Sequence, residues 1–238
     1  MSVEYLRNIV QNGRRIAVLL GRNPAMNSGC EFYKEEFDYD VEEKYGRSSE
    51  EIFSSNFYHN RPKEFYEFYR EEILKKQGEL DAADYFIKRL EDADKLEGVV
   101  TRGFFNRCKR AGVTKEIQLY GSIDANRCPR CGKIFDSHYI IDSTGIPKCD
   151  VCQIPIHPGV VLKGEMVDNY NMTRAAEIVS RADTLIILGT NMNSPLISML
   201  RYFNGEKVAL VNSVPHFADR KADCVCIGDF EEILTKVF

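Results

Sequence analysis

Two Cys-x-x-Cys pairs constrain this chain more than any other feature of its sequence. The first pair is Cys128 and Cys131, and the second is Cys149 and Cys152. Four thiolates satisfy the tetrahedral coordination of zinc, and two such pairs on a small hairpin leave no open position on the ion. We therefore expect a structural zinc ion rather than a catalytic one. Two disulfides or four free thiols are the alternatives, and in a chain of this size without a secretion signal the pattern favours metal.

The length and charge of the chain limit its class. With 238 residues and 44% hydrophobic content, it is long enough to bury a sizeable core. Its net charge of -4 gives no overall attraction to nucleic acid or to anionic membranes. No apolar run approaches the roughly 18 residues that span a bilayer, and the N-terminus does not resemble a signal peptide. We expect a cytoplasmic protein that binds neither nucleic acid nor membrane.

Short apolar runs separated by helical patterns predict an α/β fold. Residues 16–20 form a buried run that ends at Gly21, and residues 184–188 form another that continues into Gly189-Thr190-Asn191. A further strand is expected over residues 117–120. The last third alternates helix, strand, helix, strand, strand and helix, which is typical of a mainly parallel sheet with helices on both faces. A strand followed by a glycine turn is how a Rossmann-like nucleotide-binding sheet begins.

Two segments interrupt this pattern. One is rich in aromatic and charged residues, with helical spacing after Pro62, and we interpret it as a helical insertion whose aromatic stripe is core. The other carries the four cysteines. The predicted units are a Rossmann-like nucleotide-binding domain (1–29, 79–125 and 155–238), a helical insertion (30–78) and a zinc module (126–154).

Several blocks, taken in order, resemble the sirtuins, the family of NAD-dependent deacylases and ADP-ribosyl transferases. Leu119-Tyr120-Gly121-Ser122 resembles the L-H-G-S stretch that precedes the family's cysteines, and residues 157–165 resemble R-P-x-V-V-x-F-G-E. The other matching blocks are Gly21 with Ser28-Gly29, residues 101–112, the four cysteines, residues 182–191 and Val211-Asn212. The resemblance implies a Rossmann-like domain and a smaller zinc-and-helix lobe, with NAD and an acyl-lysine peptide meeting between them.

The positions that the family uses for catalysis are largely replaced. Tyr120 stands where the resemblance places the catalytic histidine. A phenol, which ordinarily ionises near pH 10, is a poor general base at neutral pH. Arg102, Gly103 and Phe105 stand at the Gln, Asn and Asp that order the ribose and nicotinamide. Lys163 replaces an apolar residue on the expected peptide strand, where a cation would favour an acidic group.

The adenosine end of the expected site is better retained. Strand-end amides and a helix N-terminus favour phosphate, and an asparagine at a strand end suits a ribose hydroxyl. The predicted nucleotide-binding residues are Gly21, Ser28, Gly189, Thr190, Asn191 and Asn212. A plain strand-to-helix turn is the alternative for Gly189 and Thr190.

Three functions follow from these residues. The first is a divergent sirtuin that binds NAD or an ADP-ribose-type nucleotide with weak or lost deacetylase activity. The second is an active NAD-dependent protein deacylase or ADP-ribosyltransferase. In support of this second function, the aromatic pattern of the chain over residues 29–69 faintly resembles the macrodomain-associated microbial sirtuins. That resemblance implies an acylated or carrier protein as partner. The third is a non-catalytic partner-binding protein with a closed cleft.

Overall fold

A six-stranded parallel sheet forms the larger part of the molecule. The computed structural model describes residues 2–237. The strands lie in the order β3-β2-β1-β6-β7-β8, the doubly wound Rossmann arrangement. They are β1 (Ile16–Leu20), β2 (Leu96–Thr101), β3 (Glu116–Gln118), β6 (Thr184–Leu188), β7 (Lys207–Asn212) and β8 (Cys224–Ile227). Strand order reverses between β1 and β6, which are paired in register at the centre of the sheet. The predicted α/β fold is confirmed.

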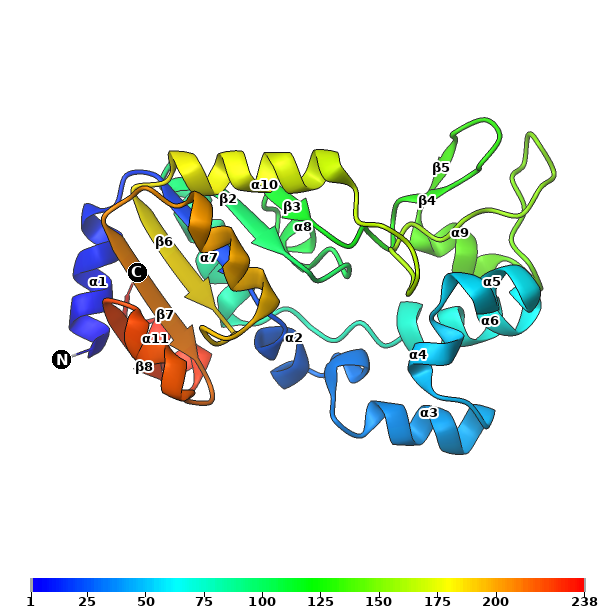
Figure 1. The fold of residues 1–238 in the computed structure, drawn as a ribbon, viewed down its shortest axis with the longest axis horizontal. Coiled ribbons are helices and arrows are strands. Elements are labelled where there is room, and N and C mark those ends of the chain that lie inside the picture. Colours follow the sequence, from blue (N-terminus) through cyan, green and yellow to red (C-terminus); the bar gives the residue numbers. More distant parts are fainter. Residues whose placement is uncertain (1, 238) are drawn as a thin grey trace.

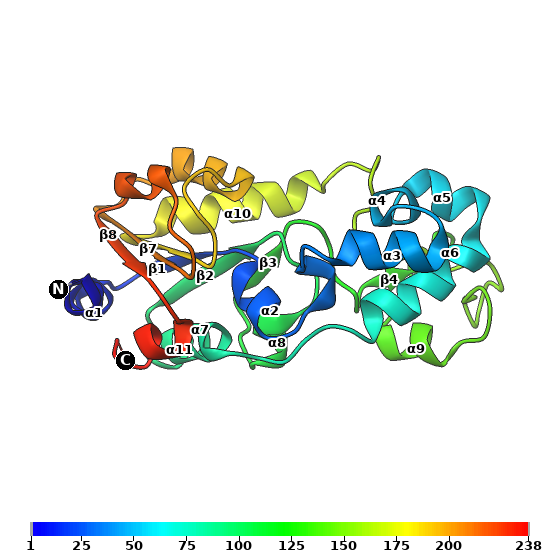
Figure 2. The same ribbon diagram turned by 90° about the horizontal axis from the view of Figure 1, so that it is seen from below.

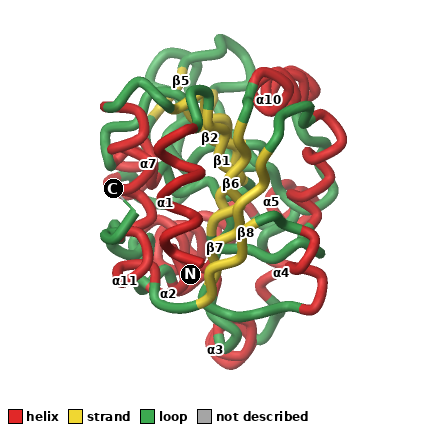
Figure 3. Tube along the Cα trace, turned by 90° about the vertical axis from the view of Figure 1, so that its left-hand side faces the viewer, coloured by secondary structure: helices red, strands yellow, loops and turns green. Residues whose placement is uncertain are grey.

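Helices cover both faces of this sheet, as Figures 2 and 3 show. On one face lie α1 (Ser2–Asn12), α7 (Ala82–Asp92), α8 (Arg107–Arg110) and α11 (Phe230–Leu234). On the other lie α10 (Asn169–Arg181) and the 3-10 helix η3 (Pro195–Tyr202). Each layer has its own apolar core, with Leu6 and Phe86 in the first and Val179 and Leu196 in the second. Because both faces are covered, β1 and β6 are buried at every position, and apart from Thr184 at the start of β6 they are apolar throughout.

A smaller lobe lies beyond one end of the sheet (Figure 1). α2 (Asn23–Asn27) follows β1 and leads into this lobe. The helical part of the lobe contains η1 (Glu31–Tyr33), α3 (Phe37–Tyr45), α4 (Ser49–Ile52), α5 (Ser55–Asn60), α6 (Pro62–Phe68) and the π-helix η2 (Tyr69–Leu74). Its cysteine-bearing part contains β4 (Asn126–Arg127), β5 (Ile134–Phe135) and α9 (Ser137–Asp142). The remaining 3-10 helix, η4 (Phe217–Lys221), lies beside the sheet before β8.

The two parts of this lobe share one core. Phe65, Phe68 and Tyr69 are fully buried and belong to the same apolar cluster as Phe135 and Ile140. The aromatic stripe is therefore core, as the sequence predicts. Because the core is shared, the folded state of the cysteine segment and that of the helical insertion stabilise each other.

The strand expected over residues 117–120 is shorter than predicted. β3 ends at Gln118, and Leu119 and Tyr120 lie in the turn that follows. Gly121 takes a positive φ of 78°, and a Cβ there would lie 2.2 Å from the carbonyl oxygen of Gly159. This close approach bends the chain away from the sheet, and Tyr120 is placed beyond its carboxyl edge.

Within residues 2–237, no helix is long and apolar enough to cross a membrane.

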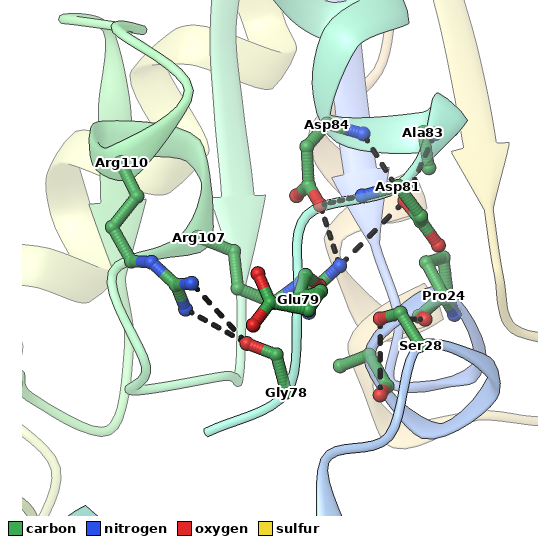
Figure 4. A network of polar contacts seen from close by, with 10 residues as sticks. Pro24, Ser28, Gly78, Glu79, Asp81, Ala83, Asp84, Arg107 and Arg110 are labelled. Carbon is green, nitrogen blue, oxygen red and sulfur yellow. Dashed lines mark hydrogen bonds and ion pairs between the residues drawn. The ribbon is translucent and has the colours of Figure 1, made fainter.

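A buried ion pair between Asp84 and Arg107 stabilises the part of the chain that returns from the smaller lobe to the sheet (Figure 4). Asp84 is fully buried, and its carboxylate accepts a 2.5 Å hydrogen bond from Arg107. The Arg107 guanidinium also donates to the carbonyl oxygen of Glu79 at 2.6 Å. The backbone N–H of Glu79 in turn donates to the carbonyl oxygen of Ser28. This network joins α7, α8 and the segment after α2.

We expect Arg107→Lys to destabilise the protein by about 1–2 kcal/mol, because an ammonium cannot reproduce the planar contacts of the guanidinium. The melting temperature should fall by roughly 2–8 °C at this chain length. Arg110→Lys is the matched control on the same helix, because Arg110 is exposed and its guanidinium donates to the Gly78 carbonyl oxygen at the longer distance of 3.2 Å. Equal melting temperatures for the two variants in differential scanning calorimetry would contradict this account.

Candidate functional site

A cavity of about 600 Å³ lies at the carboxyl ends of the central strands. Gly21 and Arg22 follow β1, Arg102 and Gly103 follow β2, and Thr190 with Asn191 follows β6. Tyr120 lines the same cavity, and Phe32 and Phe53 of the smaller lobe form an apolar wall. Ligands of open α/β sheets bind at this position, where the strand order reverses, and the volume suits a small organic molecule. The cleft is open, which argues against the closed-cleft alternative.

Two glycines allow the loops after β1 and β6 to touch. A Cβ at Gly21 would lie 2.3 Å from the carbonyl oxygen of Gly189. Gly189 has a φ of 72°, and a Cβ there would lie 2.1 Å from Cδ of Pro24. No side chain fits at either position. Gly21 borders the cavity, whereas Gly189 is set behind Pro24 and does not line it.

Two of the predicted nucleotide-binding side chains are used within the protein. Asn212 is 2% exposed, accepts a 2.8 Å hydrogen bond from the side chain of Asn23, and donates to the carbonyl oxygen of Val214. The Ser28 hydroxyl donates to the carbonyl oxygen of Pro24 at 2.8 Å. Neither residue lines the cavity. Of the six predicted residues, the structure brings Gly21, Thr190 and Asn191 to the cavity wall.

Tyr120 is paired with Arg102, a contact that the sequence does not reveal. The guanidinium donates to the phenolic oxygen at 3.0 Å, and its central carbon lies 4.7 Å from the centre of the ring. No histidine is among the described residues that line the cavity. The Tyr120 hydroxyl accepts from Arg102, so its own proton is available to a ligand. This end of the cavity is built to donate hydrogen bonds.

Aromatic packing closes the site at Phe105, the position that the resemblance matches to an aspartate. Phe105 is 1% exposed and meets the ring of Tyr33 edge-on, with centres 5.6 Å apart. A Cβ at Gly103 would lie 3.2 Å from Oγ1 of Thr101 and 3.4 Å from the Tyr33 hydroxyl. Burial raises the pKa of Tyr33 well above its usual value, so this hydroxyl stays protonated. The pocket that Phe105, Gly103 and Tyr33 line is narrow, with a volume of about 20 Å³, and Glu116 and Gln118 are among its polar lining residues.

His157 and Lys163, which belong to the matching block 157–165, lie outside the cavity. His157 is held by Glu165, with Nε2 and Oε1 2.9 Å apart, and its Nδ1 lies 2.8 Å from the carbonyl oxygen of Pro158. Lys163 forms a 2.6 Å ion pair with Glu50. Lys163 borders a second cavity of about 470 Å³, on the far side of Phe53.

The four cysteines of the smaller lobe meet as predicted. The sulfur atoms of Cys128, Cys131, Cys149 and Cys152 all lie within 4.8 Å of one another, and none forms a disulfide. Zinc–sulfur bonds of about 2.3 Å give a tetrahedron with edges of about 3.8 Å. The Cys131 and Cys149 sulfurs are 3.7 Å apart, and the Cys152 N–H donates to the Cys149 sulfur. These residues fit a structural zinc ion, which would cross-link the two knuckles.

A doubly wound sheet with a cleft at its switch point and a four-cysteine lobe defines a Rossmann-type protein that uses zinc for structure. The Sir2 family model matches residues 31–194. A protein described as an NAD-dependent protein deacetylase of Clostridium acetobutylicum is 33% identical, over 99% of this chain and 98% of its own length. A Clostridium perfringens protein with the same description is 29% identical, over 99% of this chain and 98% of its own length. The chain belongs to the Sir2, or sirtuin, family.

Solved structures agree with this assignment. A sirtuin from a study of substrate affinity superposes with a TM-score of 0.86, at 26% identity, covering 100% of this chain and 98% of that one. A Sir2 mutant with tyrosine in place of a histidine, described with a p53 peptide and NAD, gives a TM-score of 0.80 at 26% identity. That match covers 100% of this chain and 97% of the other. The expected family and its fold are confirmed.

Proposed function

We propose that this chain is a divergent sirtuin that binds NAD or an ADP-ribose-type nucleotide in the central cavity and deacetylates protein lysines slowly. The observation that carries the proposal is the cavity wall itself. Gly21, Thr190 and Asn191 are suited to phosphates, while Tyr120 and Arg102 occupy the end where the family has its base. Backbone amides at a helix N-terminus favour phosphate oxygens. The Gly21 N–H donates to the carbonyl oxygen of Leu188, so Gly21 contributes space for a phosphate rather than a donor. The proposal extends to residues 1–29, 79–125 and 155–238 as the nucleotide-binding domain.

The slow rate follows from which groups are present at the reacting end. A general base must accept a proton from a ribose hydroxyl, within hydrogen-bond reach. The described residues that line the cavity include no histidine and no carboxylate that could accept this proton. The Tyr120 oxygen already accepts from Arg102. This chain's residues therefore bind and orient a nucleotide better than they remove a proton.

An active NAD-dependent protein deacylase or ADP-ribosyltransferase is the second candidate. The open cavity favours it, as does the description of the clostridial relatives as deacetylases. A Sir2 enzyme with tyrosine in place of a histidine also holds both peptide and NAD, so such a replacement is compatible with occupied sites. The substrate would be an acylated protein or a carrier protein in the cytoplasm. Mass spectrometry of nicotinamide release separates the two candidates.

Thr190→Phe is expected to weaken ADP-ribose binding at least about tenfold, because the larger side chain fills cavity space beside Gly21. Calorimetric titration measures the affinity. Thr173→Phe on α10 is the matched control, because Thr173 is exposed and lies outside the cavity. Unchanged affinity in Thr190→Phe would place the nucleotide elsewhere.

A further inference from the structure

The charged side chains that line the central cavity are all cations. Arg22 and Arg102 line it, and none of its other described lining residues is charged. The chain as a whole carries a net charge of -4, so this concentration of positive charge runs against the average. Carboxylates do line the neighbouring cavity, which Arg22 also borders. Arg102 lines the central cavity and does not border this acidic neighbour.

Arg102 has no carboxylate partner within residues 2–237. It makes one hydrogen bond, to the Tyr120 hydroxyl, and its guanidinium stacks on the same ring. A guanidinium has five N–H donors and no acceptor. The other donors of Arg102 are free to meet a ligand, and its charge is not neutralised by the protein. The Tyr120 hydroxyl adds a donor at the same place.

A nucleotide with a pyridinium ring, such as NAD, carries negative charge on its pyrophosphate and positive charge on its nicotinamide ring. Its pyrophosphate is attracted by the arginines, whereas its pyridinium cation is repelled by them and meets no carboxylate among the described residues that line this cavity. Glu116 lines the small adjoining pocket, where burial raises its pKa to about 7 and so weakens its negative charge at neutral pH. The Debye length is about 10 Å at 0.1 M salt, so salt screens such charges only partly across a cavity of this size. Arg102 is exposed, so solvent screens part of this repulsion, and the difference in affinity should be largest at low salt.

We propose that the cavity selects nucleotides that lack the pyridinium cation, so that ADP-ribose and reduced NADH bind more tightly than NAD. This inference rests on the proposed function, since it concerns the same cavity. Arg102 is the residue that sets the preference. The protein would accordingly be occupied by the ADP-ribose class of ligand when both classes are present at equal concentration.

NAD and NADH are the sharpest pair of probes, because they share a shape and differ mainly in the charge of the nicotinamide ring. In calorimetric titrations of the zinc-loaded protein at low salt, we expect NADH to bind about tenfold more tightly than NAD, the ratio that one close charge–charge contact supplies. ADP-ribose should show a preference of the same sign. In Arg102→Gln the NADH-to-NAD ratio should fall below about twofold.

Arg174→Gln is the matched control. Arg174 is also stacked on a tyrosine, Tyr170, at 5.6 Å, but it lies on α10 outside the cavity. Its ratio should equal that of the unmodified protein. Equal or tighter binding of NAD in the unmodified protein would overturn the inference and leave the proposed function standing. A preference that survives in Arg102→Gln would overturn the role of Arg102, and no binding of any nucleotide would overturn both proposals.

Discussion

Cys149→Ser is expected to release zinc and to unfold the smaller lobe. Cys149 is fully buried, and its sulfur lies 3.7 Å from that of Cys131. Structural zinc contributes roughly 10–16 kcal/mol to folding in zinc-finger peptides. A loss of even several kcal/mol lowers the melting temperature by on the order of 10 °C at this chain length. Because the helical insertion shares the core of the cysteine segment, the aromatic cluster should loosen as well.

Elemental analysis and thermal unfolding measure this result. The unmodified, reduced protein should hold about one zinc ion per chain, as four thiolates in one shell require. Cys108→Ala is the matched control, because Cys108 is equally buried but lies in the core beside the sheet. It should keep its zinc. Full zinc content in Cys149→Ser, or no metal in freshly purified reduced protein, would disprove the zinc site.

Deacetylation of an acetylated peptide is expected to be about 10² to 10⁴ times slower than by the Clostridium acetobutylicum relative, the range that loss of a general base costs. Tyr120→His alone should not restore the rate. Arg102 would still face the new imidazole, and Phe105 with Tyr33 would still close the space for polar contacts. Effects within one site are not additive, so the individual losses are not multiplied.

The rate is measured by mass spectrometry of deacetylated peptide and of nicotinamide. The informative series is Tyr120→His, then Tyr120→His with Arg102→Gln, with Tyr170→His as an exposed control on α10. Rapid turnover by the unmodified chain would contradict the account and point to another base. Activity in Tyr120→His alone would show that the remaining pocket is intact and that only the base is missing.

Much of the fold could be predicted because its signals are local. The apolar runs of β1 and β6 are buried at every position, so they stand out from their surroundings. The cysteine spacing predicts the metal cluster, since each knuckle places two sulfurs within a few residues. Helical spacing of Phe65, Phe68 and Tyr69 predicts a buried stripe, and all three are fully buried.

The details of the cleft could not be predicted, because they depend on contacts between distant segments. The sequence predicts that Asn212 binds a ribose hydroxyl, but the side chain of Asn23, 189 positions earlier, donates to its amide oxygen. Pro24 packs against Gly189, which holds that glycine away from the cavity. The Arg102–Tyr120 contact joins the ends of β2 and β3, and no local pattern in the sequence marks it. These contacts decide the chemistry, although they barely alter the fold.

Equilibrium binding of ADP-ribose to the zinc-loaded protein tests the central claim most directly. The claim is that the cavity beside Gly21, Thr190 and Arg102 is a nucleotide site that is retained while the base is replaced. Calorimetric titration should give a single site per chain, with an affinity that falls as salt rises because arginine charge contributes to it. Absence of binding at millimolar ADP-ribose, in protein shown to be folded and zinc-loaded, would contradict the account.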